Sequence, residues 1–468
     1  MLLLRQIASR AAGLSGGLFA LLGLAGLLSG GPAFAAQPSS EAVTAFVDVN
    51  LVPMDRDHVV PHQTVLVKDG TIVAVGAAVA VPASATVIDG RGRAFLSPGL
   101  ADMHTHAESV DDMKVYLANG VTSVLNMGGA SSDFMDQRRP LLNAAQRPGP
   151  HVYAAFRVDG SPRYGQFVIK TPDEARWIVR LAKTNGYDFI KAYNDLSPEC
   201  FAALVEEGRR QHMAVVGHGV TRVGLERQLD EGQVMVAHAE EFLYTTIAPR
   251  TQAGDPYAAP DRALIPGAIA FVKRDHAFVT ADLNTFATMA GQWGRPEVVQ
   301  AYLQAPQAQF LSPDRRIEWR HEDYARRTGS LSSRLAFLAQ FVKAMSDAGV
   351  PLIAGTDAPT IPGLFPGYSL HDDLTALVGA GLSPYQALAA ATRTPGDLIV
   401  ATVPGAQRFG VIEAGARADL ILTDGDPLRD LGVLRTPAGV MAGGRWYDRA
   451  RLSGLLAEVA ADYDNLGR

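Results

Sequence analysis

The pattern of apolar and polar positions predicts that both ends of the chain are rich in β-structure. In "VLVKDGTIVAVG", two runs of alternating apolar residues are separated by Asp69 and Gly70. Alternation with a period of two predicts half-buried strands, and an Asp-Gly pair between them predicts a hairpin. Near the C-terminus, "VMAGGRWYD" offers Gly443 and Gly444 as a second turn, and "ADLILTDGDP" predicts a strand that ends at glycine and proline.

Between these ends, predicted helices alternate with predicted strands. In "TPDEARWIVRLAKTNG", Thr171 and Glu174 form a capping-box pattern at the start of a helix. Pro172 fits the first helical position, and Gly186 fits the end of the helix. The strand "YDFIK" follows, and the same order repeats through "SPECFAALVEEGRRQH", "MAVVGHG", "VGLERQLDEG" and "VMVAHAEEF". Helices between strands at this spacing predict parallel βα units.

The segment 245–334 is harder to assign. It contains a predicted strand, "AFVTADL", and the polar stretch "SPDRRIEWRHEDYARRTG". The mixed charges of that stretch predict a helix that faces solvent, and a lid over a functional site is the alternative.

Length and composition favour one large α/β barrel with a smaller accessory domain. The chain has 468 residues, and 47% of them are hydrophobic, which is enough to fill a sizeable core. The formal net charge is −6 without a long block of one sign, so nucleic acid is not the expected partner and a small-molecule substrate fits better. A homo-oligomer is compatible with the sequence, although no segment requires one. The single cysteine, Cys200, excludes an internal disulfide and is predicted to be a small core residue.

The first 35 residues are predicted to be a secretory signal. Arg5 and Arg10 precede an uncharged apolar stretch, and the small-x-small sequence "AFA" at 33–35 stands before Ala36. We therefore expect a periplasmic or secreted mature protein without a membrane partner. A signal retained as a membrane anchor is the alternative.

Polar side chains follow several of the predicted apolar strands. The residues at these strand ends are His104 and His106 after "GLADM", Lys191 in "YDFIK", His218 in "AVVGH", His238 in "VMVAH" and Asp357 in "PLIAGTD". Taken singly, each has a structural alternative, such as a hydrogen-bonded histidine or an aspartate in a turn. The carboxyl ends of barrel strands carry the reactive groups of such proteins, so together these residues predict a metal-binding active site.

These motifs resemble the amidohydrolase superfamily of metal-dependent hydrolases. The matching features are "HTH" at 104–106, a lysine after the fourth barrel strand, single histidines after the fifth and sixth, and "GTDAP" at 355–359. The stretches "SLHDDLTALVGAGLSPYQALAAATRTPGDLI" and "GVIEAGARADLILTDGDPL" extend the resemblance over nearly the whole mature chain. In detail, the chain is most similar to the imidazolonepropionase-related branch, which includes Xaa-Pro dipeptidases and other hydrolases with a carboxylated lysine.

The resemblance implies a distorted (β/α)8 barrel of the TIM type with a small β-sandwich made from both chain ends. The expected domains are the signal peptide at 1–35, the N-terminal part of the sandwich at 36–97, the barrel at 98–405, and the C-terminal part of the sandwich with a tail at 406–468.

The resemblance also implies a centre of two divalent metal ions. One ion would bind His104, His106, Asp357 and a carbamate formed from Lys191 and carbon dioxide, and the other would bind the same carbamate, His218 and His238, with a hydroxide bridging the two. An unmodified lysine ammonium would be repelled by metal ions, and a carbamate removes that conflict. Nitrogen and oxygen ligands without thiolate suit zinc, manganese, cobalt or iron, and zinc is the expected metal.

Such a centre predicts an enzyme that cleaves an amide or peptide bond in a small substrate, namely a dipeptide or an N-acyl amino acid. The bridging hydroxide would attack the carbonyl carbon, and Asp357 would take the proton and pass it to the leaving nitrogen. A lactone or phosphotriester hydrolase is the nearest alternative. A mononuclear deaminase and a non-catalytic metal-binding barrel are further alternatives.

Three other residues are candidate substrate contacts. Tyr193 lies two residues beyond Lys191, so it shares the same face if the strand continues, and its hydroxyl could bind a carbonyl oxygen or a tetrahedral intermediate. His371 begins a helical pattern where related enzymes place a histidine that contacts the substrate. Arg157, at the end of "HVYAAFR", could pair with a substrate carboxylate. The alternatives are a packed tyrosine, a helix-end or surface histidine, and a surface salt bridge.

Overall fold

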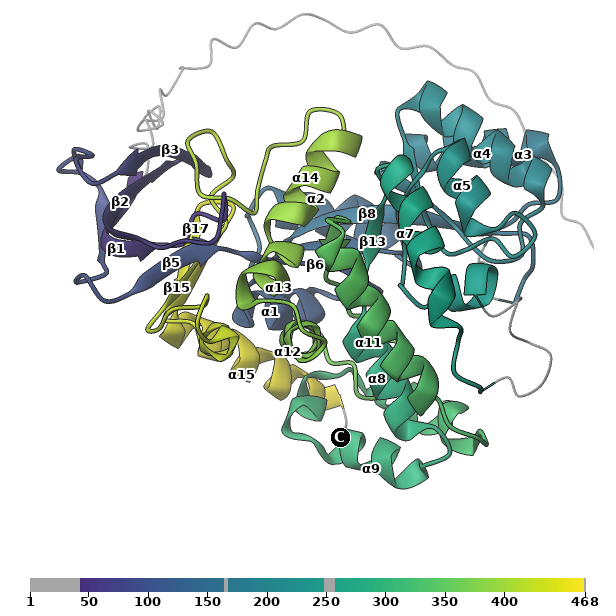
Figure 1. Ribbon diagram of the computed structural model, residues 1–468. Helices are drawn as coiled ribbons and strands as arrows, with labels where there is room; N and C mark the ends of the chain where they lie inside the picture. Colours follow the sequence, from purple (N-terminus) through teal and green to yellow (C-terminus); the bar gives the residue numbers. More distant parts are fainter. Residues whose placement is uncertain (1–42, 164–166, 248–256, 467–468) are drawn as a thin grey trace, which may run out of the picture. The chain divides into compact units, whose positions relative to one another are not determined.

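Two β-sheets organise the part of the chain that the computed structural model describes, residues 43–163, 167–247 and 257–466 (Figure 1). The predicted signal at 1–35 and its cleavage site lie outside these residues. One sheet is mostly antiparallel and draws its strands from both chain ends, and the other is built from parallel strands. The structure confirms the predicted TIM-like barrel with a separate β-domain.

The parallel strands form a nearly closed barrel. Its strands are β6 (Leu100–Thr105), β7 (Val121–Asn126), β8 (His151–Asp159), β10 (Phe189–Ala192), β11 (Ala214–Gly217), β12 (Gln233–Val236), β13 (Phe278–Thr280) and β14 (Leu352–Ile353), and the short β9 (Phe167–Val168) pairs with β8. The two edge strands, β6 and β14, meet through a hydrogen bond of 3.2 Å from the Met103 N–H to the Ala354 carbonyl. A bridge between Thr105 and Ala358 continues this closure just beyond β14.

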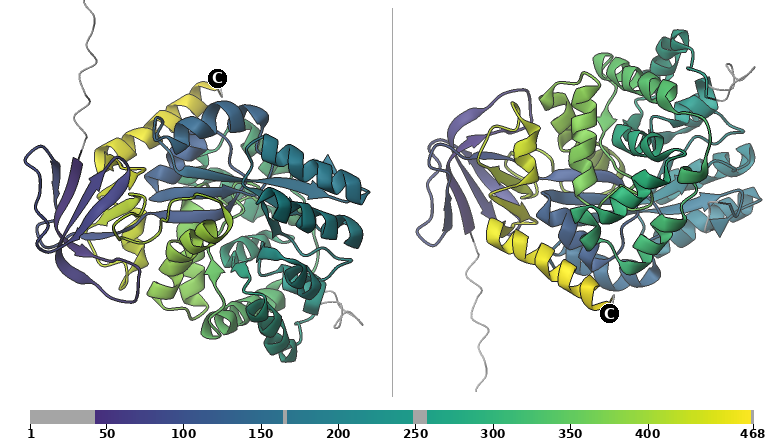
Figure 2. Two further views of the ribbon diagram at one scale, coloured as in Figure 1. Left: turned by 90° about the horizontal axis from the view of Figure 1, so that it is seen from above. Right: turned by 90° about the horizontal axis from the view of Figure 1, so that it is seen from below.

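The second sheet joins the two ends of the chain. Its strands are β1 (Val43–Leu51), β2 (Val60–Lys68), β3 (Thr71–Gly76), β4 (Thr86–Asp89), β5 (Phe95–Pro98), β15 (Leu420–Thr423), β16 (Gly439–Ala442) and β17 (Arg445–Asp448). The junction is the antiparallel pairing of β5 with β15, so N-terminal and C-terminal strands lie side by side (Figures 1 and 2).

Both predicted hairpins of this sheet are confirmed. Asp69 and Gly70 connect β2 to β3 with φ values of 48° and 75°. Gly443 and Gly444 connect β16 to β17 with φ values of 54° and 81°. Two consecutive residues with positive φ make the turn whose twist matches that of the flanking strands, which explains the Asp-Gly and Gly-Gly pairs.

Helices cover the outside of the barrel. They are α1 (Val110–Ala118), α2 (Arg139–Asn143), α3 (Pro172–Thr184), α4 (Pro198–Gln211), α5 (Leu225–Glu231), α7 (Ile265–Arg274), α8 (Leu283–Gln292), α9 (Pro296–Gln304), α10 (Pro313–His321), α11 (Ser332–Asp347), α12 (Tyr368–Gly379), α13 (Pro384–Ala390) and α14 (Arg393–Thr402). The final helix, α15 (Arg449–Leu466), packs along α1 through Val115, Val459 and Tyr463 (Figure 2). Within the described residues, none of the helices has both the length and the apolar character needed to cross a membrane.

Local sequence signals account for several helix ends. Thr171 and Glu174 form the predicted capping box at the start of α3, Pro172 occupies its first turn, and Gly186 follows its C-cap with a φ of 77°. Within the polar stretch "SPDRRIEWRHEDYARRTG", residues Pro313–His321 form the helix α10, but it is not simply a solvated surface helix. Trp319 on α10 is buried and packs against Phe365, and its indole N–H donates to the Pro359 carbonyl.

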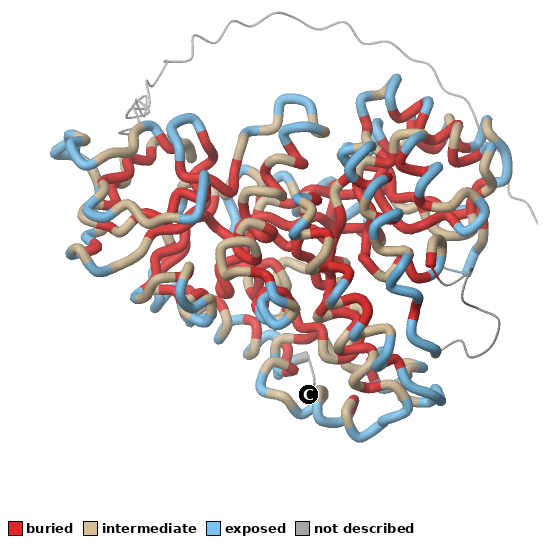
Figure 3. Tube along the Cα trace, in the orientation of Figure 1, coloured by how far each residue is buried: buried red, intermediate tan, exposed pale blue. Residues whose placement is uncertain are grey.

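Burial is concentrated along the barrel strands (Figure 3). Every residue of β6 and β7 is buried, as expected for parallel strands that are covered on both faces. Cys200 is buried in the core between α3 and α4, which confirms the predicted packing role. The predicted domain boundaries at 35, 97 and 405 stay predictions, since both sheets belong to one compact unit.

A buried ion pair ties the β-domain to the barrel. Arg417, just before β15, lies 2.6 Å from Asp419 through its Nε atom, and both side chains are almost fully buried. The Arg417 guanidinium also donates to the hydroxyls of Tyr153 on β8 and Ser123 on β7. Asp419 in turn accepts a hydrogen bond of 2.8 Å from the Gly443 N–H. Removing either charge would therefore leave the other buried without its partner.

We expect Asp419→Ala to lower the free energy of unfolding by about 3–5 kcal/mol, because it leaves the Arg417 guanidinium unpaired in the interior. Chemical denaturation with far-UV circular dichroism would measure the change. The matched control is Asp424→Ala, which removes an exposed partner of Arg449 at 2.8 Å and should cost about 1 kcal/mol or less. Equal effects of the two substitutions would contradict this assignment.

Candidate metal centre

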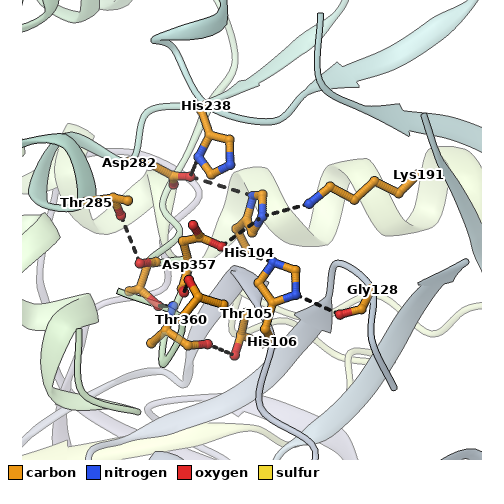
Figure 4. Close-up of polar contacts among 12 residues, drawn as sticks. His104, Thr105, His106, Gly128, Lys191, His238, Asp282, Thr285, Asp357 and Thr360 are labelled. Atoms are coloured by element: carbon orange, nitrogen blue, oxygen red, sulfur yellow. Dashed lines mark hydrogen bonds and ion pairs between the residues drawn. The ribbon is translucent and has the colours of Figure 1, made fainter. Parts of the chain in front are cut away.

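The six side chains predicted from the strand ends converge inside the barrel. They are His104 on β6, His106 directly after β6, Lys191 on β10, His218 directly after β11, His238 after β12 and Asp357 after β14. Figure 4 shows Lys191, His238 and Asp357 pointing toward His104 from different sides. Because parallel strands present their carboxyl ends at one mouth of the barrel, residues far apart in sequence meet there.

His104 stands at the centre of this cluster. Its Nε2 atom lies 3.2 Å from Lys191 Nζ and 3.6 Å from Asp357 Oδ1. His106 Nε2 lies 3.0 Å from the same Asp357 oxygen, and its Nδ1 lies 2.7 Å from the Gly128 carbonyl oxygen. A carbonyl only accepts, so Nδ1 of His106 carries a proton, and Nε2 is the nitrogen that faces Asp357. The two histidines and Asp357 therefore offer ligand atoms to one cation.

His218 and His238 form the second part of the cluster. Their ring centroids lie 5.0 Å apart with the rings nearly perpendicular, and the His238 ring lies 4.1 Å from that of His104. Tyr193 stacks on His218 with 4.0 Å between ring centroids. The Lys191 Nζ atom lies 5.4 Å from the centroid of the Tyr193 ring, so this tyrosine is placed at the site as the sequence predicted.

Asp282 belongs to the site but was not among the predicted residues. Its Oδ2 atom lies 2.6 Å from His238 Nδ1 and 3.7 Å from His104 Nδ1 (Figure 4). Together with these two histidines, Asp282 forms a second group of side chains that could hold a cation. A Cβ on Gly355 would come within 2.6 Å of Asp282 Oδ1 and 2.8 Å of His104 Cβ, so only glycine fits between them. The sequence feature that could have identified Asp282 was its place near the end of the predicted strand "AFVTADL".

Glu241 is the second functional residue that the sequence reasoning missed. Its Oε1 atom lies 2.7 Å from His218 Nδ1, and the side chain is almost fully buried. The signal for it was weak, because "HAEEF" places two glutamates after His238 and nothing in the sequence distinguishes Glu240 from Glu241.

The protonation states of most of these groups suit a divalent cation. His238 is the exception: burial opposes its charge, but the contact with Asp282 outweighs burial and raises the pKa of His238 to about 9. Burial lowers the pKa of His104 and His218 well below the usual range, so both imidazoles are neutral and keep a lone pair. Burial also lowers the pKa of Lys191 to about 7. Burial opposes a charge on Asp357, but the contact with His106 outweighs it and holds the pKa of this carboxyl below its ordinary value. Neutral imidazoles and an ionised carboxylate are the forms that bind a metal ion.

Arg157 faces the same space from the neighbouring strand. It pairs with Lys191 in the register of β8 and β10, and its guanidinium carbon lies 5.9 Å from the Tyr193 ring centroid. The Arg157 Nε atom is buried without a hydrogen-bond partner among the described residues. A cavity of about 770 Å³, lined also by Glu108 and Ser131, adjoins this side chain. The Arg157 guanidinium is therefore a positive charge that a bound ligand could contact.

His371 does not join the cluster, contrary to its predicted role as a substrate contact. It lies on α12 and is buried, with its Nε2 atom 2.8 Å from the carbonyl oxygen of Asn119. Asn119 caps the C-terminal end of α1, just before β7 begins. This contact therefore lies at the amino ends of the barrel strands, opposite the end that carries the metal-centre residues. His371 is therefore a packed residue that links α12 to α1.

Comparisons with solved structures agree with this architecture. A bottromycin amidohydrolase superposes with a TM-score of 0.69 at 23% identity, covering 90% of this chain and 90% of that protein. An Xaa-Pro dipeptidase with bound methionine in its active site gives 0.64 at 18% identity, covering 87% and 100%. Molinate hydrolase gives 0.62 at 18% identity, covering 88% and 95%.

At the level of sequence, no protein-family model matches the chain, and no curated protein matches it at a significant level. The resemblance rests on the three-dimensional arrangement, at identities where only the fold follows. The chain therefore has the fold of these solved amidohydrolase and dipeptidase structures.

Proposed function

We propose that this chain is a metal-dependent hydrolase with a binuclear centre, which cleaves an amide or peptide bond in a small substrate. The proposal depends above all on the convergence of four histidines, Lys191 and Asp357 from different barrel strands onto one buried space. The solved hydrolases with this fold support it, since their names include an amidohydrolase and a dipeptidase.

The residues present fit two divalent metal ions, and zinc is the proposed metal. The first ion would be held by His104, His106, Lys191 and Asp357, and the second by Lys191, His218 and His238. When bound, two such ions polarise a substrate carbonyl and lower the pKa of a water molecule.

Lys191 is proposed to act as a carbamate. Its neutral amine nitrogen would form a bond to the carbon of carbon dioxide and release one proton, which gives a carboxylate in place of the neutral amine. The pKa of about 7 leaves a large fraction of neutral amine at neutral pH, and only the neutral amine has the lone pair for this reaction. The 3.2 Å contact of the lysine nitrogen with His104 Nε2 supports a carboxylate that would lie among the imidazoles.

Asp357 is proposed to be the general acid and base. Its carboxylate is ionised and faces His104 at the end of β6 and His106 just after it, so it can accept a proton from the attacking water. It would then donate that proton to the leaving nitrogen. The Tyr193 hydroxyl is proposed to donate a hydrogen bond to the carbonyl oxygen as negative charge develops there.

A free carboxylate on the substrate is proposed to pair with Arg157. The Arg157 Nε atom, which has no hydrogen-bond partner among the described residues, supports this contact, which fits a dipeptide or an N-acyl amino acid. The name of the Xaa-Pro dipeptidase with this fold is consistent with such a substrate. The basic and apolar N-terminal stretch supports export of the mature protein to the periplasm or beyond.

We expect Arg157→Met to raise KM for a carboxylate-bearing substrate by about 10- to 100-fold with a smaller change in kcat, since a hydrogen bond to a charged group contributes about 1.5–3 kcal/mol. Steady-state kinetics on a dipeptide and on its C-terminal amide would measure this. The wild type should prefer the free acid, and the variant should lose that preference. An unchanged preference would remove Arg157 from the binding site.

The proposed function is tested by metal content and hydrolysis together. We expect about two zinc ions per chain by elemental analysis of protein produced with added bicarbonate. The same protein should hydrolyse members of a panel of dipeptides and N-acyl amino acids, lose activity to a chelator and regain it with zinc. A panel of lactones and phosphotriesters serves as the comparison. Turnover of the comparison panel alone would overturn the amide assignment, and a single ion per chain would overturn the binuclear centre.

A further inference from the structure

We propose that Glu241 is a positioning residue that fixes the ring and the proton of His218, so that Nε2 is the nitrogen presented to the metal centre. This inference rests on the proposed function for the existence of the metal ion. The sequence pattern does not predict a contact between the two residues, because His218 follows β11 and Glu241 lies beyond β12.

The carboxylate of Glu241 is held from both sides. Its Oε1 atom lies 2.7 Å from His218 Nδ1, and its Oε2 atom accepts hydrogen bonds from the Gly219 N–H at 3.1 Å and from Asn194 Nδ2 at 3.3 Å. Asn194 Nδ2 also donates to the Gly219 carbonyl over 2.9 Å. Loops after three neighbouring strands, β10, β11 and β12, therefore meet at one carboxylate.

The space around this carboxylate is tight. A Cβ on Gly219 would come within 2.6 Å of Thr245 Cγ2 and 3.1 Å of Glu241 Oε2. The Thr245 hydroxyl donates to the Glu241 carbonyl over 2.8 Å and fixes the backbone of the turn that carries the glutamate. A side chain at position 219 would therefore displace either Thr245 or the Glu241 carboxylate.

The His218 ring and its backbone have further contacts. Tyr193 stacks on one face, and the His218 carbonyl accepts a hydrogen bond of 3.0 Å from Gln228 Nε2. An ionised carboxylate only accepts hydrogen bonds, so the 2.7 Å contact with Glu241 favours the tautomer of a neutral His218 ring that has its proton on Nδ1. The lone pair then resides on Nε2, which is the arrangement that a metal-binding histidine needs.

The substitution Glu241→Gln should move the ring proton of His218 from Nδ1 to Nε2. Two donors, the Gly219 N–H and Asn194 Nδ2, face Oε2, so a glutamine must place its carbonyl oxygen there. Its amide NH2 group would then point at His218 Nδ1 and donate to it. The ring proton would move to Nε2, and His218 could no longer bind a metal through that atom.

The test uses the full chain labelled with ¹⁵N-histidine, first with the metal removed and then titrated with zinc. In the metal-free wild type we expect the His218 signal, assigned by its loss in His218→Gln, to report a protonated Nδ1 and an unprotonated Nε2. In Glu241→Gln the same signal should report a protonated Nε2. The affinity for one of the two zinc ions should fall by about 10- to 100-fold, and that for the other should stay the same.

Two further variants separate positioning from general stability. Asn194→Ala removes one donor to Glu241 without touching His218, so it should weaken the same ion by a smaller factor. Glu207→Gln removes a buried carboxylate on α4, remote from His218, and should leave the tautomer and both affinities unchanged. A wild-type tautomer in Glu241→Gln would overturn the inference. Absence of zinc binding in the wild type would instead overturn the proposed function, because the tautomer is read without metal.

Discussion

Replacing Lys191 by alanine should reduce the metal content from about two ions to about one per chain, and should lower kcat/KM at least about 10³-fold, because metal assistance contributes several kcal/mol to such reactions. In the proposed centre Lys191 is the only residue shared by both ions. Its amine reaches the middle of the cluster, 3.2 Å from His104 Nε2. Elemental analysis and steady-state kinetics on the same preparation would measure both effects.

Loss of the lysine amine should not by itself destabilise the metal-free fold when the side-chain volume is kept. Burial lowers the pKa of Lys191 to about 7, so the folded state gains little from a charge on this side chain. Lys191→Met, which keeps most of the volume, should melt no lower than the metal-free wild type and should show the same loss of one ion. The control is Lys343→Ala, an exposed lysine paired with Asp347 on α11, which should keep both ions. A Lys191→Ala protein that retains two ions and full activity would rule out the shared ligand.

The residues of the site that were predictable share one local signal. His104, His218 and Lys191 each end an apolar β run, and the geometry of a parallel barrel then brings such ends together without further information. The same rule would have found Asp282 at the end of "AFVTAD", had that segment been recognised as a strand of the barrel. The surrounding segment 245–334 has little other regular patterning, so the strand was predicted without being assigned to the barrel.

Other features depend on contacts that no local pattern carries. His371 was predicted to face the substrate from its place on a helix, but the helix turns it toward Asn119, 252 positions away in sequence. Glu241 was missed because its role is set by Gly219 and Asn194, which lie on other loops. The hairpins at Asp69-Gly70 and Gly443-Gly444 were predictable, since a two-residue turn is decided by its own φ angles.

Asp357→Asn should lower kcat by about 10²- to 10⁴-fold while leaving most of the metal in place, because general acid and base catalysis contributes about that factor. Asn keeps an oxygen that can face the ion but has no carboxylate to accept and return a proton. The backbone supports this choice of substitution. Asp357 has a φ of 56°, a left-handed conformation that asparagine adopts more readily than alanine.

The measurement is kcat and metal content side by side for the wild type and Asp357→Asn. Asp69→Asn is the matched control, since Asp69 also has a positive φ of 48° but lies in the hairpin between β2 and β3. It should change neither quantity. If Asp357→Asn loses metal and activity in equal proportion, Asp357 is a ligand alone and another group moves the proton. If activity falls while both ions stay, the carboxylate that faces His104 and His106 is the proton carrier, and the leaving nitrogen receives its proton from that side of the centre.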